Sequence, residues 1–169
     1  EVMIRPDGRD PLCPPVPWNG PRLDDPIPVA VTKESYGYPI HDDILKMIDQ
    51  AAKALQDAGY QVVEVATPSI DEPFRDWFRT LITEMKVGLL PQIVEHGSED
   101  IKTTFDYFFQ MGEVLELDEF IIDFGDRTRM MRDWNLFLSE FPLVLTPIYM
   151  NRLYDWDYDL QSFEACKDF

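Results

Sequence analysis

The side chains that could carry out covalent chemistry are scattered along this chain. A serine nucleophile needs a base within hydrogen-bond reach and usually lies in a tight, glycine-flanked turn. Only Ser98 follows a glycine, and Glu99 and Asp100 behind it are typical of the start of a helix. Cys13 lies among prolines without a basic neighbour that would lower the pKa of its thiol. We therefore predict no catalytic residue from these patterns.

The pattern of metal-binding residue types is also incomplete. His41 and His96 are far apart, and neither belongs to a His-Glu-x-x-His motif. The run Asp155–Asp159 resembles the first three ligand positions of a calcium loop. Leu160 stands where that loop needs glycine, and Cys166 replaces the bidentate glutamate. We interpret the run as a solvated acidic loop, and we expect neither a metal nor a cofactor.

Two groups of charged residues have more than one interpretation. Glu84 lies in an aromatic stretch and could be a buried acid with a raised pKa, although a solvent-facing or salt-bridged glutamate is favoured. Arg127, Arg129 and Arg132 could form an anion clamp. Acidic neighbours at helical spacing instead favour surface ion pairs, and these neighbours are Asp123, Asp126 and Asp133.

The composition limits the classes of partner. A chain of 169 residues with 45% hydrophobic residues fits one globular domain. A net charge of −17 disfavours nucleic acid and anionic membrane surfaces as partners. No apolar stretch approaches the roughly 20 residues of a membrane span. Two distant cysteines favour a reducing compartment, so we expect a cytoplasmic protein. Because the chain begins with Glu1, it could be a piece of a longer protein.

A strand, a helix and a second strand follow one another near the beginning of the chain. We expect the first strand over Ile27–Val31 and the helix over Asp42–Ala58, and a Gly59-Tyr60 turn then leads into the second strand, which reaches Val65. This order is the pattern of a parallel α/β sheet. The intervening segment Thr32–Pro39 has one glycine, whereas a phosphate-binding loop needs several. His41 is expected to cap the helix. We therefore interpret this unit as a packing unit.

The remaining segments predict a connector, three more helices and a strand. We expect residues 1–28 to form a proline-rich extended connector and residues 29–169 to form the α/β domain. A helix should follow Ser69–Glu72 and reach a kink or end at Pro91; Ser98 should open the next, which ends near Gly112. Asp118 should cap a fourth that runs to about Phe141. The apolar run Pro142–Pro147 predicts a strand buried on both faces.

The order of these features is more specific than any single one. Asp7–Pro11 precedes the proline-rich link Pro17–Pro21, and the strand-helix-strand unit, with Asp57–Tyr60, follows. Thr83-Glu84-Met85 comes next, and Phe137-Leu138 leads into the Thr146-Pro147 strand. In this order the chain resembles the amidase signature family, which includes amidases and the A subunit of glutamyl-tRNA amidotransferase. The resemblance covers almost the whole chain but only part of the family's C-terminal half.

The resemblance implies a fold and an activity for an intact parent protein. Members of the family hydrolyse amides through a serine nucleophile, a second serine after a cis peptide bond, and a lysine base. Those residues belong to the N-terminal half, and nothing in this chain matches their motif, so no catalytic residue carries over. The chain would be a slice of the amidase signature fold, a partial mixed or parallel sheet flanked by helices, and inactive alone.

What the resemblance leaves for this chain is scaffold and part of a substrate-pocket wall. The candidate wall residues are Trp77, Leu81, Glu84, Thr146 and Tyr149. Aromatic core packing is the competing interpretation of Trp77. The expected partners are the missing N-terminal half of the parent and its small amide substrate, with a homo-oligomer as a further option. The alternative hypothesis is a free-standing, non-catalytic α/β interaction module.

Overall fold

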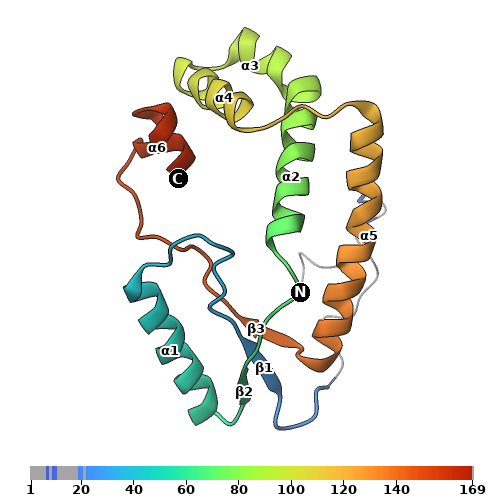
Figure 1. Cartoon of the computed structure of the whole chain (residues 1–169), viewed down its shortest axis with the longest axis vertical. Helices are drawn as coiled ribbons and strands as arrows, with labels where there is room; N and C mark the ends of the chain where they lie inside the picture. The colour runs from blue at the N-terminus through green and yellow to red at the C-terminus, as the bar shows by residue number, and fades with distance from the viewer. Residues whose placement is uncertain (1–6, 8, 11–18, 21, 169) are drawn as a thin grey trace.

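The computed structural model of the chain describes residues 7, 9, 10, 19, 20 and 22–168. Most of the expected connector, residues 1–28, lies outside the described residues, so its extended course stays a prediction. The described part is a mixed α/β structure with one small sheet and several helices (Figure 1).

The sheet contains three parallel strands in the order β2-β1-β3. Strand β1 spans Pro28–Val31, helix α1 spans Asp42–Asp57 and strand β2 spans Gln61–Glu64. Strand β3, Leu143–Leu145, pairs with the other edge of β1, with Ala30 beside Val144. The predicted strand-helix-strand unit and its parallel pairing are confirmed.

Local chemistry explains the boundaries of α1. The Nδ1 atom of His41 accepts a hydrogen bond from the Asp43 backbone N–H at 3.1 Å, so His41 caps the helix as predicted. After the helix, Gly59 has φ of +95°, a left-handed conformation that favours glycine. Ile48 is buried, and the central strand fills the core: Val29, Ala30 and Val31 are at most 2% exposed.

The expectation for β3 is only half right. The apolar run does form a strand, but β3 lies at an edge of the sheet and pairs with β1 alone. Leu143 is 40% exposed, so the strand is not buried on both faces. A continuous apolar run indicates that both faces of a strand are suited to burial. In the described part of the chain, no element covers the outer side of β3.

The remaining regular elements of the described chain are helices and helical turns. In order they are α2 (Asp71–Glu84), the π-helical turn η2 (Met85–Leu89), α3 (Leu90–His96), α4 (Glu99–Met111) and α5 (Leu117–Glu140). After β3 come the short 3₁₀ turn η3 (Tyr158–Leu160) and helix α6 (Phe163–Asp168). The run Asp155–Asp159, interpreted from the sequence as a loop, extends into η3, and neither η3 nor α6 was predicted.

Two helix boundaries differ in detail from the predictions. The side chain that caps α5 belongs to Glu116, which forms a reciprocal capping box with Glu119, so the prediction of Asp118 as the cap is wrong. Pro91 stands in the first turn of α3, directly after the π-helical turn. The helical course runs on from the π-helical turn into α3 without a break, so the missing N–H of Pro91 falls directly after the change of helix type.

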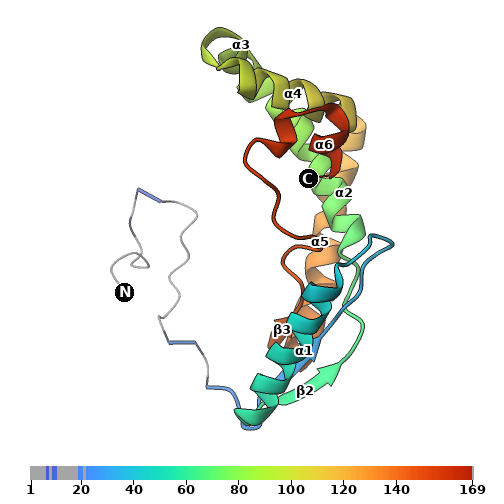
Figure 2. The same ribbon diagram turned by 90° about the vertical axis from the view of Figure 1, so that its left-hand side faces the viewer.

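The sheet and the short helices lie at opposite ends of the molecule (Figures 1 and 2). The sheet and α1 form one end, α3 and α4 form the other, and α2 and α5 run between them (Figure 1). The chain exposes 12774 Å² of surface. A compact protein of 19.8 kDa exposes about 8,600 Å². The whole chain therefore exposes more surface than a compact protein of its mass.

Candidate functional site

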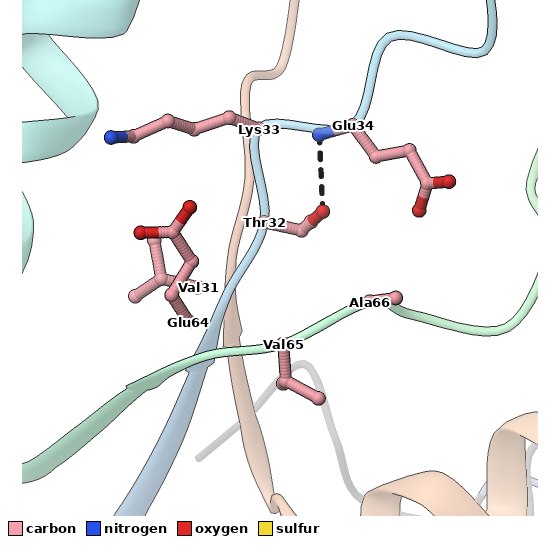
Figure 3. Close-up of a pocket in the computed structure, with 7 residues that line it drawn as sticks. All are labelled: Val31, Thr32, Lys33, Glu34, Glu64, Val65 and Ala66. Atoms are coloured by element: carbon pink, nitrogen blue, oxygen red, sulfur yellow. Dashed lines mark hydrogen bonds between the residues drawn. The ribbon is translucent and has the colours of Figure 1, made fainter.

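The carboxyl-terminal edge of the parallel sheet contains an open hollow. Ligands of parallel α/β sheets bind outside this edge, because the loops that follow the strands converge there. The hollow has a cavity volume of about 310 Å³ and is lined by Val31, Thr32, Lys33, Glu34, Glu64, Val65 and Ala66 (Figure 3). These residues come from the ends of β1 and β2 and from the segments just after them.

Thr32 fixes the floor of the hollow. It is 4% exposed, and its backbone N–H donates to the Leu145 carbonyl at 3.1 Å, which ties the end of β1 to β3. Its Oγ1 accepts a hydrogen bond from the Glu34 N–H at 3.1 Å (Figure 3). The hydroxyl oxygen is thus committed to shaping the turn, which gives Thr32 a structural role.

Lys33 carries the only amine that lines the hollow, and it is held in its charged form. Its Nζ pairs with Asp49 of α1. The hydrogen bond that Nζ donates to the Asp49 carboxylate raises the pKa of Lys33, and the negative charges of Asp49 and Glu64 add to the shift. A lysine that acts as a general base needs a lowered pKa. Lys33 can therefore attract an anionic or polar group, but it is poorly suited to remove a proton.

The predicted wall residues fall into two groups. Trp77, Leu81 and Glu84 follow one another at helical spacing along α2. Trp77 is 55% exposed and its ring packs 5.7 Å from that of Phe74, so it is not a core residue within this chain. Glu84 is exposed, which contradicts the buried-acid alternative and agrees with the favoured solvent-facing interpretation.

The second group follows β3. Thr146 is half-buried directly after the strand. Tyr149 packs edge-on against Tyr154, with ring centroids 6.1 Å apart. From here the chain runs toward α6 on the side of the molecule opposite α5 (Figure 1). Ring contacts thus place Trp77 and Tyr149 in different neighbourhoods, and their shared role as a pocket wall stays a prediction.

The neighbourhood of Tyr149 contains a tyrosine cluster that the sequence analysis missed. The rings of Tyr154 and Tyr158 stack at 4.3 Å, and both hydroxyls donate to an Asp168 carboxylate oxygen, at 3.0 and 3.1 Å. Burial and the hydrogen bonds with Tyr149 and Asp168 raise the pKa of Tyr154. The cluster holds α6 against the preceding segment. Tyrosines spaced four residues apart were the available signal for it.

Thr83 is a second residue whose importance the sequence analysis understated. Its Oγ1 donates to the Arg79 carbonyl at 2.9 Å and accepts from the Leu115 N–H, also at 2.9 Å. The link joins α2 to the segment that leads into α5. The Thr-Glu-Met motif that contributed to the family resemblance therefore contains a structural side chain.

The arginines of α5 behave differently from one another. Arg129 pairs with Glu72 of α2 and lies 4.0 Å from both Asp126 and Asp133, as the ion-pair interpretation predicted. Arg127 and Arg132 form no ion pair within the described part of the chain, so for them that interpretation is wrong.

Two further kinds of site to consider are a metal cluster and a membrane-spanning helix. Among the described residues, no group of three or more histidine, cysteine or carboxylate side chains could hold a metal ion. Within the same residues, every helix is too short or too polar to cross a bilayer. Cys166 is buried, and burial raises the pKa of its thiol, which disfavours a reactive thiolate.

Comparison with known proteins identifies distant relatives. The chain is 31% identical over 147 residues to an indoleacetamide hydrolase of Bradyrhizobium japonicum. It is 30% identical over 147 residues to an indoleacetamide hydrolase of Bradyrhizobium diazoefficiens. The chain is thus similar to part of two indoleacetamide hydrolases. No family model matches it.

The two alignments cover very different shares of the proteins compared. Each includes 87% of this chain, but only 32% of the first relative and 28% of the second. The chain thus spans about a third of the length of the curated relatives it matches. The similarity supports the amidase resemblance at the level of homology, because indoleacetamide hydrolases are amidase-signature enzymes.

Proposed function

We propose that this chain is a segment of an amidase-family hydrolase that cleaves a carboxamide, and that the segment alone is inactive. The observation that carries the proposal is the 31% identity to an indoleacetamide hydrolase across 87% of the chain. The chain's residues would supply scaffold and part of a pocket wall. The serine nucleophile, the second serine and the lysine base implied by the amidase resemblance would come from outside the chain.

The proposed reaction converts an amide and water to a carboxylic acid and ammonia. In the mechanism implied by the resemblance, the serine oxygen attacks the amide carbonyl carbon, and the C–N bond breaks as the nitrogen leaves with a proton. Water then attacks the acyl-serine ester and releases the acid. Lys33 in the sheet hollow is held charged by Asp49 and is poorly suited to act as a base. This agrees with the proposal that the catalytic base comes from outside this chain.

The substrate class that fits best is an arylacetamide. The relatives are named for an indole-bearing amide. In this chain, α2 presents Trp77, which is 55% exposed, beside Phe74, which is 51% exposed. An aromatic substrate ring packs well on such side chains, in offset or edge-on geometry. We propose that Trp77 and Leu81 contact the aryl group of the substrate and that the amide points toward the catalytic serine.

Release of ammonia from indoleacetamide tests the proposal. We expect none above buffer with this chain, and turnover with the protein encoded by the longer reading frame. Acetamide is the matched control, because it has the same reacting group without the aryl ring and should be a poorer substrate. Amide hydrolysis that co-purifies with this chain through every chromatography step would refute the proposal that the chain alone is inactive. If the longer protein cleaves neither amide, the proposed hydrolase activity is refuted.

Trp77→Ala in the longer protein tests the wall. Loss of an aryl contact should raise KM for indoleacetamide and leave the rate with acetamide unchanged. Val94→Ala is the control, because Val94 is also exposed but lies on α3. Equal losses for both substrates would mean that Trp77 supports the fold and not the aryl group.

A further inference from the structure

Helix α5 carries a stripe of residues whose spacing alternates between four and three. This spacing repeats every seven residues and is the pattern by which one helix packs along another. We call these residues the α5 stripe: Leu117, Ile121, Phe124, Thr128, Met131, Asn135 and Leu138.

The α5 stripe is uncovered within the described chain. Leu117 is 75% exposed, Phe124 is 65% exposed and Met131 is 56% exposed. The neighbouring Met130, which lies outside the stripe, is only 8% exposed. Arg129 pairs with Glu72 of α2. The helix therefore turns another side toward α2 and leaves its most regular apolar side in water, an arrangement that usually marks an interaction surface.

The geometry and charge of the α5 stripe indicate what would cover it. A seven-residue repeat fits a second helix that crosses at about 20°. Arg127 and Arg132 stand on either side of the stripe and form no ion pair within the described residues. Residues in such flanking positions pair across a helix-helix interface. The fitting partner is therefore an amphipathic helix with an apolar seam and acidic flanks.

The length of the relatives suggests where that helix comes from. Two thirds or more of each relative lies outside the matched region. A second copy of this chain fits less well, because each copy carries a net charge of −17. We infer that the α5 stripe binds an amphipathic helix with acidic flanks, contributed by the part of the longer protein outside this chain. This inference rests on the proposed function, since both need the longer protein.

Methionine oxidation tests the inference without any substitution. Brief treatment with hydrogen peroxide, followed by peptide mass analysis, reports exposure of each methionine. Met131 is the reporter and the buried Met130 is its neighbouring control. Met47 of α1, which is 62% exposed, reports any general loss of peroxide access.

In this chain alone, Met131 and Met47 should oxidise quickly and Met130 slowly. In the longer protein, Met131 should slow to the rate of Met130 while Met47 stays fast. Equal Met131 rates in the two proteins would overturn the inference. So would protection of Met131 in this chain that grows with its concentration, because a second copy would then be the occupant.

A matched pair of substitutions gives an independent readout. Ile121 lies in the α5 stripe and is 61% exposed, whereas Ile122 lies outside it and is 63% exposed. Ile121→Glu should lower the Tm of the longer protein well below that of Ile122→Glu, while the two variants of this chain alone should melt together. Equal Tm values in the longer protein would overturn the inference. Hydrolysis of indoleacetamide is scored separately, so an active protein with an uncovered stripe refutes only the inference.

Discussion

The sheet unit and the two long helices, α2 and α5, differ in how they bury their side chains. Strand β1 has a hydrogen-bonded strand on each side, and Val29, Ala30 and Val31 are almost completely buried. Helices α2 and α5 are joined by ion pairs between charged side chains. Arg79 lies 3.5 Å from Asp123 and 3.7 Å from Glu119, and Arg129 pairs with Glu72. The α5 stripe stays exposed.

The difference shows which part of the chain is complete by itself. The contact between α2 and α5 leaves Arg79 Nε and Asp123 Oδ2 buried without a hydrogen bond in the described part of the chain, although Asp123 Oδ2 lies 3.5 Å from Arg79 Nη1. Buried polar groups without a hydrogen bond lower the stability of the folded state, whereas buried apolar contacts like those of β1 raise it. The sheet unit should therefore be the stable core of this chain. The helix pair should depend more on surroundings that lie outside it.

The largest effect is expected in the sheet. Val29→Asp places a carboxylate at a position that is 1% exposed, with no cation beside it in the sheet, and should cost on the order of 4 kcal/mol or more of unfolding free energy. Ile122→Asp, on α5, should change it by less than about 0.5 kcal/mol, because Ile122 is 63% exposed. Urea denaturation measures both. Similar losses would erase the contrast between the two regions.

A pair of glycines tests the packing within the helical region. A Cβ at Gly112 would lie 2.4 Å from Ile82 Cγ1, a side chain that is fully buried. Gly112→Ala should therefore cost about 1–3 kcal/mol through overpacking. Gly125, inside α5, has open space around it, so Gly125→Ala should stabilise by about 0.5–1 kcal/mol. Thermal melts give both signs, and a stabilising Gly112→Ala would show that α2 packs loosely there.

The cap of α1 should give a smaller effect. His41→Ala removes the acceptor of the Asp43 N–H and should cost about 1 kcal/mol. His96→Ala is the control, because His96 is exposed near the end of α3. Denaturation of both variants at the same pH measures the difference. If His41→Ala behaves like His96→Ala, the cap adds nothing to the sheet unit.

The smallest effect concerns acidic crowding beside α2. Burial, and then the charges of Asp123 and Glu72, raise the pKa of Asp76 above its ordinary value of 3.8. The folded state thus binds this proton more tightly than the unfolded state, and stability from it is lost as pH rises above that value. Asp76→Asn should slightly raise the Tm at pH 7 and leave it unchanged near pH 3. A lower Tm at pH 7 would contradict this crowding.

The sequence predicted the sheet unit well because its signals are local. The apolar strand, the amphipathic helix, His41 and Gly59 each specify their own backbone conformation. The exposure of Leu143 could not be predicted in this way, since it depends on what lies beside β3. The tyrosine cluster was missed for the same reason, because Tyr154 meets Asp168 only after the chain turns. For the predicted wall, helical spacing identified which residues are neighbours along α2. It could not show whether α2 contacts Tyr149.

Hydrogen exchange of this chain alone tests the contrast between the two regions most directly. The amides of Ala30 and Val31, in the strand that is paired on both sides, should exchange slowest and only through global unfolding. The amides along the middle of α5 should exchange faster, through local opening. Amides of α5 that are protected as strongly as those of β1 would contradict the account, because the helix would then be complete without a partner.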